Sequence, residues 1–373
     1  MSGKSIVKVL VIESTVFGYD GITNVITNYY TYQDHSKVHM DLVTINEISD
    51  GFDSVLKQHH SQNYVLPYRN SNPVKYVFEL TRIIKHGKYQ IVHVHGCSAT
   101  MAVEMLAAKL AGVKVRISHS HNTKCDHIKT DKILRPFFSK WCNVGFACGK
   151  EAGEWMFPGK EFSVITNGID LEKFQFNSVI RKDMRSSNNL DGKFVIGHVG
   201  RFSKQKNHEK LIDIFSEISK NNTNAKLVLI GDGELRENIQ ERVKNEKLDV
   251  LFVGLSDEVE KWLQAIDVIV FPSLFEGLPL GLVEAQAAGL PCVLSNTISP
   301  DTAITDLVKF VKLEAPAREW ADVVNLLQNK FDRYERIEFV KKQIRKAHFD
   351  IKVNCVDLER RYEKLITSGG KSE

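Results

Sequence analysis

The sequence lacks the features of a disulfide-stabilised or membrane-spanning protein. Its 6 cysteines follow no CxxC or paired spacing, and several lie in apolar runs, as free thiols do in a reducing compartment. No run of about 18 apolar residues occurs, and the apolar stretch at the amino terminus is too short for a signal peptide. We therefore expect a cytoplasmic protein whose membrane contact, where it occurs, is peripheral.

Motifs of the common nucleotide sites are also missing. The glycines of TVFGYDG, which follows the first expected strand, are not spaced as GxGxxG, and no GxxxxGK[ST] loop occurs. No short Asp-x-Asp is present that would bind a divalent metal to a nucleotide sugar. These absences argue against a dinucleotide cradle, a P-loop and a metal-dependent nucleotide-sugar site.

Charge is unevenly distributed along the 373 residues, a length typical of two domains. The formal net charge is only +4, yet residues 51–150 hold 15 lysines and arginines against 5 acidic residues, whereas residues 181–373 hold 30 of each. The excess indicates either an anionic partner on one domain or a solvated surface without function. Because no recognition helix or RNP-like motif accompanies it, we do not expect nucleic acid binding.

Short apolar runs alternate with amphipathic segments twice along the chain, which predicts an α/β fold of two Rossmann-like doubly wound domains facing a central cleft. We place the N-terminal domain at residues 1–180 and the C-terminal domain at 181–350, with the polar segment 175–192 as the connection between them. Residues 351–373 are expected to form a helix that packs back on the N-terminal domain. The expected strands are 8–13, 38–45, 91–96, 113–120, 143–149 and 162–168, then 193–199, 225–231, 250–254, 268–272, 292–295 and 309–313.

Ligands of parallel sheets bind beyond the carboxyl ends of the strands, so the strand-to-helix loops are the candidate sites. In GHVGRFSKQKNHEKLI (197–212), Arg201 offers a planar fork and Lys206 a point charge beside a helix amino terminus, which suits a diphosphate. In FPSLFEGLPLGLVEAQ (271–286), Glu276 and Glu284 are acceptors suited to vicinal hydroxyls. The alternatives are a solvated basic loop and two glutamates that only decorate a helix.

Histidines alternate at the ends of two expected strands of the first domain. His119 and His121 lie in RISHSHN (116–122), where we expect them to point to opposite faces or to the end of a curling loop, and His93 and His95 repeat the pattern in IVHVHG. Two histidines at a strand's carboxyl end favour a functional role over packing alone, and His95 is a further candidate. No acidic or thiol ligand lies at metal-like spacing, so we expect no zinc site.

Several motifs together resemble the retaining family 4 glycosyltransferases with the GT-B fold, in particular those of bacterial exopolysaccharide and capsule synthesis. GRFSKQKNH, IGDGEL and EGLPLGLVEAQAAGLP resemble the nucleotide-sugar half of that family, and ITNGID, HVHG and ACGKEAGEWMF extend the resemblance over nearly the whole chain. The resemblance implies that Arg201 and Lys206 bind the donor diphosphate and that Glu284 binds the ribose hydroxyls. It places Glu276 near the transferred sugar, with the backbone amides of Gly277 and Leu278 beside it.

The first loop departs from the family pattern. Gly21 matches a glycine that approaches the leaving diphosphate, but Asp20 precedes it where the family often has a second glycine. The family histidine near the sugar corresponds to His121 or His119, and we prefer His121 because Asn122 follows it.

The resemblance implies a retaining, metal-independent hexosyltransferase without a cofactor, whose donor is a nucleotide sugar, with uridine diphosphate as the commoner base. The acceptor would be a glycan or a lipid-linked saccharide used in surface polysaccharide synthesis at the inner face of the cell membrane. Residues 124–141, KCDHIKTDKILRPFFSKW, combine basic and aromatic side chains that could lie on an anionic membrane. The alternatives are a GT-B-like sugar-nucleotide epimerase and an inactive homologue that serves as a partner subunit.

Overall fold

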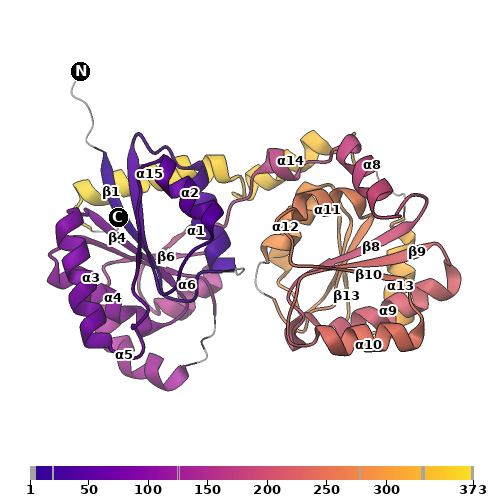
Figure 1. The fold of residues 1–373 in the computed structure, drawn as a ribbon, viewed down its shortest axis with the longest axis horizontal. Coiled ribbons are helices and arrows are strands. Elements are labelled where there is room, and N and C mark those ends of the chain that lie inside the picture. The colour runs from indigo at the N-terminus through magenta and orange to yellow at the C-terminus, as the bar shows by residue number, and fades with distance from the viewer. Residues whose placement is uncertain are drawn as a thin grey trace. The chain divides into compact units, whose positions relative to one another are not determined.

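The computed structural model describes residues 6–18, 21–123, 125, 127–276, 279–328 and 332–370. The chain forms two compact units, the first made of residues 1–168 and 351–373 and the second of residues 169–350. Each unit contains a parallel sheet with helices on both of its faces (Figure 1). The prediction of two Rossmann-like doubly wound domains is confirmed.

The sheet of the first unit has the strand order β3-β2-β1-β4-β5-β6-β7. Its central strands β1, β4 and β5 are buried along nearly their whole length, as expected for strands covered on both faces. The short edge strand β3 was not predicted, because three half-buried residues give no periodic signal. The strands are β1 (Val7–Glu13), β2 (Val38–Thr44), β3 (Asn63–Val65), β4 (Ile91–Gly96), β5 (Val115–Ser120), β6 (Val144–Ala147) and β7 (Ser163–Val164).

The helices of the first unit form two layers. On one face of the sheet α3 packs with α4 and α4 with α5, over a core that includes Leu10 and Val92, and on the other face α1 packs with α15 over Val11. The C-terminal helix α15 thus belongs to the first unit. The helices are α1 (Gly21–Tyr32), α2 (Asp50–Gln58), α3 (Pro73–Gly87), α4 (Ala102–Leu110), α5 (Ile128–Trp141), α6 (Lys150–Met156) and α15 (Ile351–Thr367).

The sheet of the second unit has the strand order β10-β9-β8-β11-β12-β13. Consecutive residues of each central strand enter opposite cores: Ile196 packs beneath α9 and α10, and Val195 beneath α11, α12 and α14. The strands are β8 (Phe194–Val199), β9 (Ala225–Ile230), β10 (Val250–Gly254), β11 (Val268–Phe271), β12 (Cys292–Ser295) and β13 (Val308–Val311). The helices are α7 (Leu171–Phe174), α8 (Ser178–Ser187), α9 (His208–Asn221), α10 (Arg236–Glu246), α11 (Val259–Ala265), α12 (Leu280–Ala287), α13 (Ala317–Leu326) and α14 (Ile337–Lys346).

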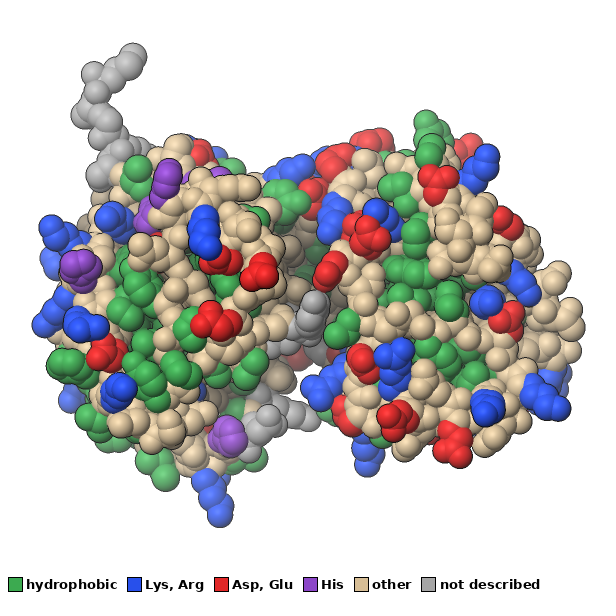
Figure 2. Space-filling view, in the orientation of Figure 1, with side chains coloured by type: hydrophobic (Ala, Val, Ile, Leu, Met, Phe, Trp, Pro, Cys, Tyr) green, Lys and Arg blue, Asp and Glu red, His purple; other side chains and the backbone are tan. Residues whose placement is uncertain are grey.

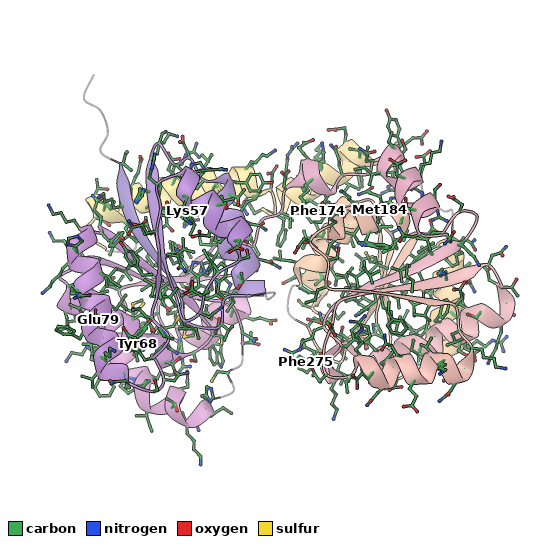
Figure 3. All side chains as sticks on the ribbon, viewed as in Figure 1. Lys57, Tyr68, Glu79, Phe174, Met184 and Phe275 are labelled. Carbon is green, nitrogen blue, oxygen red and sulfur yellow. The ribbon has the colours of Figure 1, made fainter. Side chains whose placement is uncertain are left out.

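The polar segment 175–192 is not the connection between the units, because most of it is helix α8 and it packs on α11 of the second unit. Asn177 caps the helix, Met184 and Phe174 of the preceding α7 pack on the core (Figure 3), and the guanidinium of Arg181 lies on Asp267 at 2.5 Å. The polar composition therefore reflects a solvated outer face and a partly buried ion pair. The division falls at Gly168/Ile169, earlier than the expected boundary, since α7 and α8 fold with the second unit.

The state of the cysteines and the hydrophobicity of the helices can be compared with what the sequence predicts. All 6 cysteines are free thiols. Among the described residues, no helix combines the length and the apolar character that crossing a bilayer requires.

Candidate functional site

A lysine and a glutamate meet at the carboxyl end of the second unit's sheet. The Nζ of Lys206, in the 3-10 turn η2 (Lys204–Lys206), lies 2.5 Å from Oε1 of Glu276. The two side chains are only 16% and 8% exposed, so water screens their attraction weakly. The contact is electrostatic, since its geometry is not that of a hydrogen bond at Oε1.

The two loops that carry these residues are held side by side. Gln205 donates from Nε2 to Oε2 of Glu276 at 3.2 Å and to the carbonyl oxygen of Phe275 at 3.0 Å. The carbonyl oxygen of Gln205 accepts from the backbone N–H of Leu274 at 2.8 Å. The exposed ring of Phe275 lies at this edge of the second unit (Figure 3). The positions of the cation and the carboxylate are therefore fixed by backbone as well as by charge.

Two glycine turns pack closely behind Lys206. Gly231, after β9, has a φ of +135°, and a Cβ atom there would lie 2.2 Å from the carbonyl oxygen of Gly200, after β8. Only glycine permits this approach. Arg201 follows Gly200, and its Nε donates to Oε2 of Glu234 at 3.2 Å on the exposed surface. The Arg201 guanidinium thus lies on the exposed rim of the Lys206 loop, and Lys206 is the cation that is more shielded from water.

Glu284 lies on α12, the helix that follows β11. Its side chain is half-buried, and no group among the described residues hydrogen-bonds to it. Burial raises its pKa to about 7, while Lys173 opposes the shift and Glu260 reinforces it. Its charged neighbours are thus Lys173 and Glu260, and no described contact joins it to Lys206 or Glu276. Gly277 and Leu278 lie outside the described residues.

Two buried histidines lie below the Lys206 loop. Nδ1 of His198, on β8, is 2.8 Å from the carbonyl oxygen of Val270, and the ring of His208 stacks on Phe202 at 4.1 Å. Burial lowers the pKa of both rings, that of His208 to about 4, with Lys206 adding to the effect. Both are therefore neutral imidazoles at physiological pH.

In the first unit, a buried carboxylate ends β1. Glu13 is 1% exposed, and both of its oxygens accept from Oγ1 of Thr23, at 3.1 and 3.2 Å, in the first turn of α1. Oγ1 of Thr23 in turn accepts from the backbone N–H of Gly18 at 2.9 Å. These bonds hold the start of α1, where Gly21 is the first residue, against the end of β1. A glutamate at the end of a buried strand was a signal for this role that the sequence reasoning did not use.

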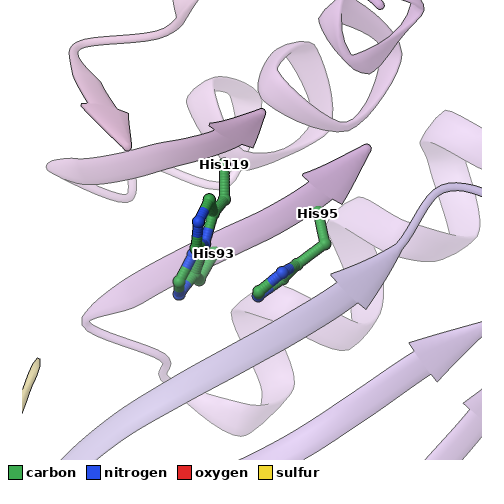
Figure 4. A group of neighbouring side chains, drawn as sticks. All are labelled: His93, His95 and His119. Atoms are coloured by element: carbon green, nitrogen blue, oxygen red, sulfur yellow. The ribbon is translucent and has the colours of Figure 1, made fainter. Parts of the chain in front are cut away.

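Four histidine rings stack at the carboxyl ends of β4 and β5. The expectation that His119 and His121 point to opposite faces is wrong: their ring centroids are 4.2 Å apart. Residues two apart in a strand share a face, so His93 and His95 stack likewise at 4.3 Å. His95 pairs with His119 across the sheet, which brings all four rings together (Figure 4 shows His93, His95 and His119).

The four rings differ in access. His119 is 1% exposed, whereas His121 is partly exposed at the end of the sheet. Burial lowers the pKa of each ring far below its ordinary value, that of His121 to about 3. Of the two candidates, His121 is thus the one that a ligand can reach, and it would meet that ligand as a neutral hydrogen-bonding group.

The ring nitrogens of His93, His95 and His119 lie within 4.8 Å of one another, close enough to hold a metal ion. Among the described residues, however, no carboxylate or thiol joins them, and both nitrogens of His93 are already engaged, with Tyr362 and His119. Binding a metal ion here would break the hydrogen bonds of His93, within a cavity of about 20 Å³. The arrangement fits a neutral hydrogen-bonded stack better than a metal centre.

Both halves of the chain match models of glycosyltransferase families. Residues 19–173 match the model described as Glycosyltransferase Family 4, and residues 179–343 match that described as Glycosyl transferases group 1. The first range contains Gly21, His119 and His121, and the second contains Arg201, Lys206, Glu276 and Glu284.

Individual proteins with similar sequences and structures are known. The putative glycosyltransferase EpsF of Bacillus subtilis is 34% identical over 321 residues, which is 82% of this chain and 83% of EpsF. The UDP-Gal:alpha-D-GlcNAc-diphosphoundecaprenol alpha-1,3-galactosyltransferase of Escherichia coli is 33% identical over 60% of this chain and 62% of its own. The crystal structure of Anabaena Alr3699/HepE in complex with UDP superposes with a TM-score of 0.78, at 17% identity over 97% of this chain and 100% of that one. A second structure of the Anabaena protein contains UDP-glucose.

Proposed function

The chain belongs to glycosyltransferase family 4, and we propose that it is a retaining enzyme that transfers a hexose from a UDP-sugar to a lipid-linked saccharide or glycan in surface polysaccharide synthesis. The donor is supported by the UDP and UDP-glucose complexes of the Anabaena protein. The acceptor is supported by the name of the Escherichia coli relative, which acts on a diphosphoundecaprenol-linked sugar.

The observation that carries the proposal is the shielded pair of Lys206 and Glu276 at the end of the second unit's sheet. A diphosphate needs cations, and a sugar needs hydrogen-bond acceptors, and this site offers one of each side by side. Arg201 at the rim adds a second cation for the diphosphate. Glu284, whose carboxylate has no hydrogen-bond partner among the described residues, is the proposed acceptor for the ribose hydroxyls.

In the reaction, the bond from the anomeric carbon to the donor diphosphate breaks while a bond to the acceptor hydroxyl forms on the same face of the sugar. The acceptor proton passes to an oxygen of the leaving diphosphate, so that no separate base is required. Lys206 and Arg201 stabilise the charge that develops on the leaving group, which is the task a metal ion performs in other enzymes. The backbone amides of Gly277 and Leu278 would assist, and Glu276 orients the sugar.

Residues of the first unit complete the proposed roles. His121, held neutral by burial, hydrogen-bonds the sugar and does not act as an acid or base near neutral pH. Gly21 lets the leaving diphosphate approach the start of α1, where helix N–H groups favour an anion. No cofactor or metal is part of the proposed mechanism.

Helix α5 is the proposed contact with an anionic membrane at the inner face of the cell. Its inner side is anchored by buried Phe138 and by Asp131, which accepts from the backbone N–H of Ala99 at 2.7 Å. Its outer side exposes Ile133 (68%) and Phe137 (47%) together with three lysines, Lys129, Lys132 and Lys140. Figure 2 shows basic and hydrophobic side chains interspersed over the first unit. Lysines attract anionic headgroups and apolar side chains enter the interface, so charge and area act together.

A flotation assay tests the membrane contact. The protein should float with vesicles that contain phosphatidylglycerol, less so as salt is raised, and not with phosphatidylcholine alone. Replacing both Ile133 and Phe137 by serine should abolish flotation, whereas Val179→Ser, at an equally exposed position (67%) of the second unit, should not. Flotation that is independent of anionic lipid would remove this part of the proposal.

A panel of nucleotide sugars tests the function itself. Purified protein is incubated with UDP-, GDP-, ADP- and dTDP-linked hexoses, and release of the nucleoside diphosphate is measured with and without a lipid-linked saccharide. One UDP-sugar should respond, with turnover stimulated by the acceptor. Isomerisation of the donor sugar without release of UDP would instead identify an epimerase, and no response from any donor would favour an inactive partner subunit.

A further inference from the structure

Hydrogen bonds divide the four stacked histidines of the first unit into two pairs. In the outer pair, Nδ1 of His95 lies 2.9 Å from Nε2 of His121. In the inner pair, Nε2 of His93 lies 3.3 Å from Nδ1 of His119. The inner pair is closed by Tyr362 of α15, whose hydroxyl lies 2.7 Å from Nδ1 of His93. The outer bond is thus the shorter of the two between rings.

The outer pair fixes which edge of His121 can meet a ligand. The backbone N–H of His121 donates to the carbonyl oxygen of Gly96 at 3.0 Å, which sets the position of the residue next to β4. The bond to His95 then occupies Nε2, so only Nδ1 remains for a partner outside the cluster. The ring planes of the two residues differ by 18°, which stacking with the neighbouring rings maintains.

The same bond couples the tautomers of the two rings. A neutral imidazole has one N–H donor and one acceptor nitrogen, so a hydrogen bond between two such rings requires that one donate and the other accept. Burial keeps both rings neutral near physiological pH, and the neighbouring histidines oppose a charge on His95 further. The state of His95 therefore decides whether Nδ1 of His121 is a donor or an acceptor.

We propose that His95 is a positioning residue, which holds the ring and the tautomer of His121 so that Nδ1 faces the transferred sugar. The proposal rests on the proposed function, because contact of His121 with the sugar is part of that function. His95 itself does not touch the donor in this account. The inner pair, which is hydrogen-bonded to Tyr362, stacks against the outer pair, with ring centroids 4.3 Å apart for His93 and His95 and 4.2 Å apart for His119 and His121.

Two isosteric substitutions of His95 separate its two nitrogens. In His95→Asn the side-chain amide takes the place of Nδ1 and can donate or accept, whereas in His95→Gln the amide reaches only the place of Nε2. We expect Asn to retain most of kcat with the responsive UDP-sugar, and Gln and Leu to lose about tenfold to a hundredfold. KM for the donor should change little, because the nucleotide contacts of the second unit are untouched. His86→Gln on the exposed surface of α3 is the control and should behave as the wild type.

The outcomes distinguish the positioning role from the proposed function. If His121→Ala reduces kcat but His95→Gln and His95→Leu do not, or if Asn loses as much as Leu, the role of His95 is overturned. If His121→Ala turns over at the wild-type rate, the contact of His121 with the sugar is wrong instead.

NMR spectroscopy tests the hydrogen bond between His95 and His121 without a measurement of enzymatic turnover. Two-bond ¹⁵N–¹H correlation spectra report the protonation and hydrogen bonding of each imidazole nitrogen. The Nε2 resonance of His121 should shift in His95→Leu and stay near its wild-type value in His95→Asn. An Nε2 resonance that does not respond to His95→Leu would show that the bond does not hold His121, and would overturn the proposal whatever the activity.

Discussion

The ammonium group of Lys206 and the carboxylate of Glu276 lie 2.5 Å apart, although one follows β8 and the other follows β11. These strands are neighbours in the sheet, so their carboxyl ends place the two loops together. In this structure each of the two charges is compensated by the other. A diphosphate that binds here has to share Lys206 with Glu276. Binding of the diphosphate would therefore affect the position of Glu276, which is proposed to hold the sugar.

Loss of Lys206 should impair chemistry more than folding. Removing one preorganised group that stabilises developing charge raises the barrier by about 2.7–4 kcal/mol, so Lys206→Ala should lower turnover at least about a hundredfold. Lys204→Ala, which removes an exposed lysine of the same 3-10 turn, is the matched control and should retain activity. Circular dichroism and single-turnover kinetics measure the two effects, and near wild-type turnover in Lys206→Ala would refute the diphosphate site.

Gly21 tests the proposed approach of the leaving diphosphate. A Cβ added at this position would meet no described atom within 4 Å, so the fold itself does not require glycine here. Gly21→Ala should leave the melting temperature unchanged or raise it slightly, because alanine favours a helix over glycine by about 0.5–1 kcal/mol. Turnover should nevertheless fall, since the methyl group would occupy the space of the ligand. Full activity in this variant would show that the diphosphate does not come close to Gly21.

Glu284 should make donor binding depend on pH. Because burial raises its pKa to about 7, the carboxylate is ionised above that pH and increasingly protonated below it. If the ionised form binds the ribose hydroxyls, affinity falls by up to about tenfold for each pH unit below 7. Calorimetric titration with an intact UDP-sugar, whose diphosphate does not ionise near neutrality, measures this dependence. The Glu284→Gln variant should bind the UDP-sugar more weakly and with an affinity that does not depend on pH. If the variant kept the pH dependence of the wild type, Glu284 would be excluded as the origin of that dependence.

The buried histidines should make the fold sensitive to mild acid. Seven rings have pKa values below the ordinary 6.5, chiefly because of burial: those of His35, His93, His95, His119, His121, His198 and His208. Above pH 6.5 these rings are neutral in both the folded and the unfolded chain. As the pH falls below 6.5 the unfolded chain takes up protons that the folded chain excludes, so each ring lowers stability by up to about 1.4 kcal/mol per pH unit.

Urea unfolding at pH 7.5 and at pH 5.5 measures this effect in a range where ordinary carboxyl groups stay ionised. Stability should be clearly lower at pH 5.5, although protonation of Glu284 in the folded chain acts in the opposite direction. The first unit holds five of the seven rings and should lose more than the second. Equal urea midpoints at the two pH values would contradict the assignment of neutral buried rings.

Strand and helix alternation predicted the two doubly wound units because nearly continuous apolar runs are the mark of strands covered on both faces. The error at 175–192 arose because polarity cannot distinguish a linker from a helix whose arginines are buried: Arg185 donates to the carbonyl oxygen of Ala265 and reaches Asp267. Such partners are distant in sequence, so only the packed structure shows them.

The sequence indicated individual residues of the candidate site but not the contacts between them. Motifs indicated Lys206 and Glu276 separately, and their contact depends on the strand order, in which β11 lies beside β8. The alternating histidines were noticed, yet their common face was misjudged, and the bonds from His95 and Tyr362 required the pairing of β4 with β5 and the return of α15. Glu13 was overlooked because it ends a strand that otherwise appears purely structural.

The stereochemistry of the first product tests the central proposal most directly. The responsive UDP-sugar, with its α-anomeric linkage, is incubated with enzyme and acceptor, and the anomeric proton of the newly formed glycoside is followed by ¹H NMR, with Lys206→Ala as the parallel sample. We expect an α-glycoside from the outset, formed at least about a hundredfold more slowly by the variant. A β-glycoside as the first product, or an equal rate in the variant, would contradict it.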